Sequence, residues 1–129
     1  MIAERRAIGD DEIDVVRVAL ERACIGDVTQ AAKAAISKLE IIARCECGCA
    51  SVDFNSPASE ERSKPIADAT AKTPRGGDVG VLVWGRHDAV TGLEIYDLGA
   101  GDGDLVLPIP ESIIPWGPTG TERGDETQR

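Results

Sequence analysis

Apolar residues recur every three or four positions near the start of the chain, which is the spacing of an amphipathic helix. They line one face of residues 10–25, and charged side chains mostly occupy the other face. The acidic residues that open this segment complement the positive end of a helix. An alanine-rich stretch at 29–36, with Asp27 or Thr29 as its N-cap, predicts a second and shorter helix.

The period then changes to two, as expected for strands with one buried face. Residues 39–47 alternate between apolar and polar positions, and a second short stretch at 51–55 does the same. The two form a tight antiparallel hairpin around Gly48, or one strand that bends there. Residues 79–84 are apolar on both faces, which predicts a central strand, and 91–98 return as another strand. Helices first and strands afterwards predict an α+β fold, in which two N-terminal helices pack on an antiparallel sheet of about four strands.

Other segments lack a clear period. Residues 57–77 contain three prolines and end in two glycines, which predicts a long loop. Residues 105–107 form at most a short edge strand, because Pro108 follows them. We expect a single α+β domain over 1–116 and a disordered tail over 117–129. We expect nearly full burial of six apolar side chains: Leu20, Ile41, Val81, Val83, Leu93 and Ile95.

The charge balance argues against some partners. The chain has 14 Lys and Arg against 23 Asp and Glu, a formal net charge of −9, whereas nucleic acids and anionic membranes attract basic faces. Aromatic residues are only 3%, which disfavours base-stacking platforms. Charged residues follow Met1 within a few positions, so no secretory signal is expected. No apolar run approaches the ~18 residues of a membrane span, so no span is expected either. We expect a cytoplasmic protein of bacterial type.

The sharpest chemical feature is a group of three closely spaced cysteines, Cys45, Cys47 and Cys49. Thiolates bind zinc, and Cys24 or His87 could supply a fourth ligand. In an extended strand the first and third thiols stand roughly 13 Å apart, so only a tight turn at Gly48 would bring them to one ion.

Two alternatives to a metal site remain for these cysteines. One is thiol redox chemistry, through a Cys47–Cys49 pair or a single thiolate near Arg44. The other is a structural role: Cys45 and Cys47 alternate in phase with Ile41, so they would face the core as small apolar groups with raised pKa values. Buried thiols of this kind would react slowly with thiol reagents in the folded protein.

His87 is the single histidine and lies in a predicted turn beside Asp88. His87, Asp88 and a cysteine elsewhere in the chain could together form a Cys–His–Asp nucleophilic site. A histidine exposed to solvent in a turn is the simpler interpretation. The glycine-rich phosphate and dinucleotide loops, the nucleophile elbow and the zinc-protease motif do not occur in this sequence. We therefore assign no catalytic residue.

Negative charge accumulates after residue 86, because Lys and Arg do not occur between Arg86 and Arg123. Three aspartates surround a glycine-rich turn there, namely Asp97, Asp102 and Asp104. They are candidates for contacting a basic protein partner through electrostatic steering. Calcium binding and a solvated turn closed by its own Asx hydrogen bonds are the alternatives.

Two stretches resemble a family of small bacterial proteins. The first runs from Arg44 to Phe54 and contains Cys-x-Cys-Gly-Cys-x-Ser-Val-Asp, and the second, Gly92 to Tyr96, contains Leu-Glu-x-Tyr after the apolar strand at 79–84. The resemblance covers about half of the chain, and the helices match only in position. The resemblance implies a shared fold unit. No activity is established for that family, so the resemblance assigns no catalytic residues.

These observations lead to two functional expectations. The first is a non-enzymatic protein-binding or regulatory module, whose contact surfaces are the 57–77 loop and the acidic C-terminal half. The alternative is a zinc- or thiol-dependent module centred on Cys45, Cys47 and Cys49. Neither a nucleic acid nor a membrane is expected as a partner.

Overall fold

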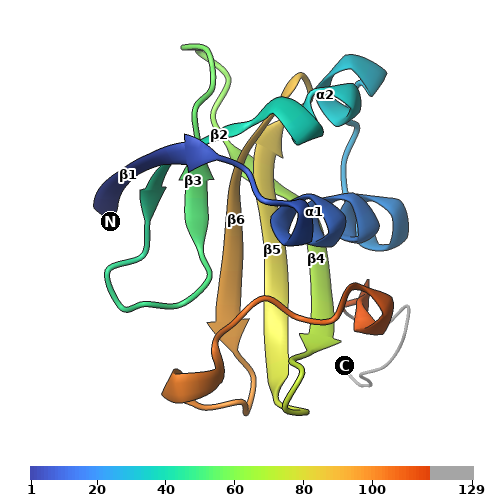
Figure 1. The fold of residues 1–129 in the computed structure, drawn as a ribbon. Coiled ribbons are helices and arrows are strands. Elements are labelled where there is room, and N and C mark those ends of the chain that lie inside the picture. Colours follow the sequence, from blue (N-terminus) through green and yellow to red (C-terminus); the bar gives the residue numbers. More distant parts are fainter. Residues whose placement is uncertain (117–129) are drawn as a thin grey trace.

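In the computed structural model, which describes residues 1–116, a long helix crosses one face of an antiparallel sheet (Figure 1). The helix is α1 (Asp10–Ala23), within the predicted span 10–25. The strands follow the order β1-β2-β3-β6-β5-β4-β7, and all their pairings are antiparallel. Their bounds are β1 Ile2–Ala7, β2 Glu40–Arg44, β3 Val52–Phe54, β4 Lys64–Lys72, β5 Asp78–Arg86, β6 Ala89–Asp97 and β7 Ile114–Pro115. The fold is therefore α+β, as predicted. The predicted tail at 117–129 lies outside the described residues.

The sheet has seven strands, so the prediction of about four was wrong. The largest error is the predicted loop at 57–77, which contains the nine-residue strand β4. Its inward positions include Ala67, Ala69 and Ala71, which are all buried, and the strand packs against α1. Alanine contributes little apolar surface, so its alternation is a weak signal even though its small size lets the helix approach the sheet closely.

The two edges of the sheet were also missed. Strand β1 pairs with β2 and is mostly exposed, so it has no apolar period to detect. The other edge is β7, which pairs with β4, whereas residues 105–107 form no strand. Strand β5 has neighbours on both sides and is buried over most of its length, as its apolar sequence predicts.

The second predicted helix is shorter than expected. Helix α2 (Gln30–Ala34) spans five residues, and the 3-10 turn η1 (Ile36–Lys38) follows it. Thr29 is the N-cap, since its Oγ1 accepts the Ala32 N–H at 3.1 Å. No helix within residues 1–116 is long and apolar enough to cross a membrane.

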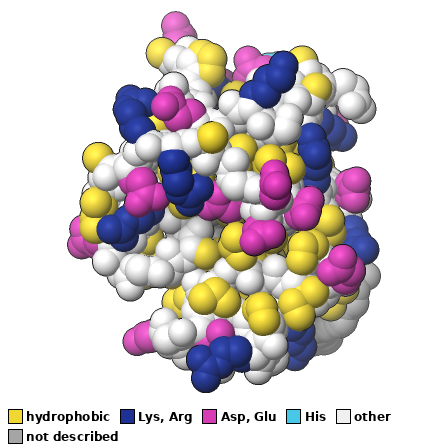
Figure 2. All heavy atoms as spheres, viewed as in Figure 1, with side chains coloured by type: hydrophobic (Ala, Val, Ile, Leu, Met, Phe, Trp, Pro, Cys, Tyr) yellow, Lys and Arg dark blue, Asp and Glu magenta, His cyan; other side chains and the backbone are white. Residues whose placement is uncertain are grey.

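The core lies between α1 and the sheet. All six side chains predicted to be buried are between 0 and 5% exposed, which confirms that part of the prediction. The segment 105–113, which includes the 3-10 turn η3 (Pro110–Ser112), closes the same side of the sheet. Figure 2 shows apolar side chains gathered on the lower part of this face. Val106 and Ile109 from this segment are exposed.

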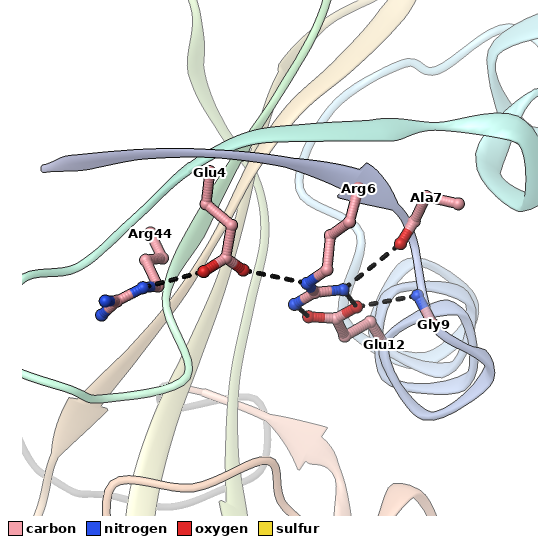
Figure 3. Close-up of polar contacts among 6 residues, drawn as sticks. All are labelled: Glu4, Arg6, Ala7, Gly9, Glu12 and Arg44. Atoms are coloured by element: carbon pink, nitrogen blue, oxygen red, sulfur yellow. Dashed lines mark hydrogen bonds and ion pairs between the residues drawn. The ribbon is translucent and has the colours of Figure 1, made fainter.

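A charged network joins β1 to α1 (Figure 3). Arg6 donates two hydrogen bonds to the carboxylate of Glu12, both at 2.8 Å, and the Gly9 N–H donates to the same carboxylate at 2.8 Å. Gly9 is the N-cap of α1 and has no side chain to cap the helix, so Glu12 does this. Glu4 bridges Arg6 and Arg44, which extends the network to β2. The network therefore ties β1 and β2 to the first turn of α1.

Candidate metal centre

The three cysteines lie on the loop between β2 and β3, around a tight turn. The Cys45 N–H donates to the Ser51 carbonyl at 3.0 Å, and the Gly48 N–H donates back to the Cys45 carbonyl at 3.2 Å. Gly48 has φ +90°, in the left-handed region that glycine adopts without strain. The turn required at Gly48 for a shared ion is therefore present.

This turn brings the three sulfur atoms together. The Sγ atoms of Cys45, Cys47 and Cys49 all lie within 4.8 Å of one another, and those of Cys45 and Cys47 are 2.9 Å apart. Tetrahedral zinc with Zn–S bonds near 2.3 Å needs sulfurs about 3.8 Å apart. The observed separations, 2.9 Å for one pair and at most 4.8 Å for the others, lie on either side of that spacing.

The prediction that Cys45 and Cys47 face the core was wrong. Cys47 is exposed, while Cys45 and Cys49 are half-buried. Strand β2 ends at Arg44, one residue before the first cysteine, so the alternation that would place both thiols inside stops there. The cysteines project from a loop, and they do not continue the buried side of a strand.

The three thiols differ in acidity. The hydrogen bond between Cys47 and Cys45 raises the pKa of Cys47 to about 11. Burial by itself raises the pKa of Cys49, but hydrogen bonds with the side chain and backbone of Ser51 outweigh it and leave the pKa lowered. Cys49 therefore ionises before Cys47 in the metal-free protein.

Ser51 anchors the loop to the sheet and was missed by the sequence reasoning. Its Oγ accepts the Ile95 N–H at 2.9 Å, donates to the Ile95 carbonyl at 3.3 Å, and accepts from the Cys49 thiol at 3.3 Å. Ser51 is buried. A buried residue that holds a metal ligand in place is typical of metal sites. The only signal in the sequence is a serine two positions after the last cysteine.

Neither proposed fourth ligand joins the cluster. The Cys24 thiol donates to the Gly26 carbonyl at 2.8 Å, and His87 Nδ1 lies 3.0 Å from Glu61 Oε1. Within residues 1–116, the cluster comprises the three cysteines and includes no histidine, aspartate or glutamate. The site therefore offers three protein thiols and a side open to solvent.

His87 belongs to a separate, exposed group with Glu61 and Asp88. The hydrogen bond from His87 lowers the pKa of Glu61. The guanidinium of Arg86 lies 3.5 Å from Asp88, and a fixed positive charge at that position opposes a bound cation. His87 pairs with the Glu61 carboxylate, and none of the cysteines joins this group. The Cys–His–Asp nucleophilic site considered from the sequence is therefore not assembled.

The three candidate partner-binding aspartates lie around the turn after β6. Asp97 Oδ1 accepts the N–H groups of Gly99 at 2.8 Å and Gly101 at 3.1 Å, and these bonds lower its pKa. Asp104 accepts a hydrogen bond from the Thr73 hydroxyl. Asp102 is exposed at the start of the 3-10 turn η2 (Asp102–Asp104). Two of the three carboxylates are therefore occupied in closing the local structure.

The fold and the site together define an α+β protein with an antiparallel sheet and a three-cysteine loop. No protein-family model, curated protein or solved structure matches the chain.

Proposed function

We propose that this is a small metal-binding protein, in which Cys45, Cys47 and Cys49 bind one zinc ion as thiolates. The observation that carries the proposal is the convergence of three sulfur atoms within 4.8 Å on one turn. Zinc prefers thiolate ligands and four-coordinate geometry, and three protein ligands leave the fourth position to water or to an external ligand.

The surroundings of the cluster support this proposal. Ser51 holds the loop on β6, so the ligands are partly ordered before an ion arrives. The exposed thiol of Cys47 leaves a path for the ion to enter. The formal net charge of −9 attracts cations. Such a site needs reduced thiols, which agrees with the expected cytoplasmic location.

Native mass spectrometry of protein purified without a chelator tests the proposal. We expect one zinc ion per chain, lost in Cys47→Ser and in Cys49→Ser. Cys24→Ser is the matched control, because Cys24 is exposed and lies outside the cluster. Failure to retain zinc after loading and desalting, or equal loss in Cys24→Ser, would refute the site.

Redox chemistry is a second candidate, favoured by the 2.9 Å separation between the sulfurs of Cys45 and Cys47. An organic hydroperoxide would oxidise the two thiols to a disulfide and would itself be reduced to an alcohol and water, so two hydrogens leave the protein. Intact mass after peroxide treatment, with alkylation of the remaining thiols, reports this step. Disulfide formation in protein that never retains zinc would favour the redox function over the metal site.

A further inference from the structure

The second face of the sheet, away from α1, is not covered by a helix of the described chain. In Figure 1, α1 and the segment 105–113 both lie on the other side of the sheet. The large outward side chains of β4, β5 and β6 are half-buried, and their inward neighbours are buried. The open face, as we name it, comprises Asp53, Asp68, Leu82, Trp84, Glu94 and Tyr96.

Contacts across strands show that these side chains form one surface. A Cβ on Gly80 would lie 2.0 Å from the Tyr96 ring, so the ring lies flat over Gly80 on the neighbouring strand. A Cβ on Gly92 would lie 3.3 Å from Asp53 Oδ1 and 3.6 Å from the Trp84 Cβ. Gly80 therefore makes room for the Tyr96 ring, and Gly92 lies between Asp53 and the base of the Trp84 side chain.

Hydrogen bonds link the aromatic rings to carboxylates. Trp84 Nε1 donates to Glu94 Oε1 at 3.0 Å. Burial, the charges of Asp68 and Glu94, and a hydrogen bond to Asp68 raise the pKa of Tyr96. In the strand register, Asp68 and Glu94 flank Leu82. The centre of the face is thus apolar and aromatic, with carboxylates on both sides.

The open face carries three carboxylates, those of Asp53, Asp68 and Glu94. Within residues 1–116, Asp53 and Glu94 form no salt bridge. The ammonium of Lys72, near the end of β4, is paired with Asp78. Carboxylates beside aromatic rings are the groups that bind arginine and lysine, through charge-assisted hydrogen bonds and cation–π contacts.

We propose that the open face docks a basic segment of a partner protein, with arginine or lysine side chains over the rings of Trp84 and Tyr96 and against the neighbouring carboxylates. A second copy of this chain would bring two acidic faces together and be repelled, as would a nucleic acid. Apolar side chains of the segment would cover Leu82. This surface is independent of the cysteine loop, so neither proposal needs the other.

The test uses the full chain and a fluorescein-labelled peptide of four alternating Arg-Val pairs, with a Glu-Val peptide of equal length as the negative probe. The altered protein is Asp68→Asn/Glu94→Gln, which removes two charges from the face with nearly unchanged side-chain shape. The matched control is Asp14→Asn/Glu21→Gln, which has the same net charge but changes exposed positions on α1. Leu82→Lys, which adds a repelling cation at the centre of the face, is a second variant.

We expect the Arg-Val peptide to bind the native protein and the Kd to rise about tenfold in Asp68→Asn/Glu94→Gln. We expect a similar rise in Leu82→Lys and little change in the α1 control. NMR shifts on binding should centre on the Trp84 indole. Equal weakening by the α1 control would show that only net charge attracts the peptide. The proposal would be overturned by that result, by NMR shifts centred on residues 97–104, or by a failure of the Arg-Val peptide to bind at low salt.

Discussion

Replacing Glu12 with glutamine tests the network that joins β1 to α1. Glu12 is 7% exposed, and its carboxylate accepts three hydrogen bonds, two from Arg6 and one from the Gly9 N–H. Glutamine keeps one acceptor oxygen but turns its amide N–H groups toward a guanidinium that can only donate. The variant therefore loses the ion pair and gains a donor without an acceptor at a buried position.

The expected loss of unfolding free energy is about 2 kcal/mol. Hydrogen bonds to charged groups contribute roughly 1.5–3 kcal/mol each, but the Arg6 side chain is 42% exposed and can regain water in the variant. A loss of about 2 kcal/mol corresponds to a Tm lower by about 8 °C for a chain of this size. Glu21→Gln, at an exposed position of the same helix, should change stability by less than about 0.5 kcal/mol.

The effect should depend on pH. Burial by itself raises the pKa of Glu12, but the bonds from Arg6 and Gly9 outweigh it, so the pKa in the folded protein is lowered. A lowered pKa contributes stability that is present above the unfolded value, near 4.3, and is lost as the pH falls through the folded value. The difference between native protein and Glu12→Gln should therefore shrink below about pH 4.

Urea unfolding at pH 7 and pH 3, followed by far-UV circular dichroism, measures both quantities. A difference below about 0.5 kcal/mol at pH 7 would show that solvation of Arg6 compensates for the lost pair. A difference of equal size at both pH values would show that the ionised carboxylate is not what stabilises the junction.

The other predictions concern packing and exposure. Gly80→Ala should destabilise by about 3 kcal/mol because its Cβ meets the Tyr96 ring, and adding Tyr96→Ala should recover part of the loss in chemical denaturation. Leu93→Ala should cost about 2–5 kcal/mol in the same assay, since Leu93 is 1% exposed, and a loss under 1 kcal/mol would contradict the core assignment. Limited proteolysis should cut within the exposed residues 57–63 before it cuts within 64–72, because the latter form β4; early cleavage in β4 would contradict that strand.

Much of the core could be predicted from local patterns. Helix α1 and strands β5 and β6 carry large apolar side chains, whose period reports directly which side is buried. The apolar pattern did not predict strand β4, because its inward residues are mostly alanines. It did not predict β1, because an exposed edge strand has no buried side. The prediction therefore failed where burial does not depend on large side chains.

The candidate metal site was also predicted only in part. The need for a turn at Gly48 followed from the reach of an extended chain, and the turn is present. The exposure of Cys45 and Cys47 depends on where β2 ends, and that end is set by pairing with β1 and β3. The pairing with β1, which lies far away in the chain, leaves no local signal, so alternation alone placed these thiols wrongly in the core.

Local patterns in the chain specify the order of the helix and the long apolar strands, the six central core residues and the close spacing of the three cysteines. The tertiary structure decided which thiols are accessible, how Ser51 holds their loop, and which residues share the open face. These two kinds of property differ in the distance along the chain over which the interactions behind them act. Periodicity and turn chemistry act over a few residues, whereas the cross-strand register that places Trp84 beside Gly92 and Tyr96 over Gly80 exists only when the sheet is assembled.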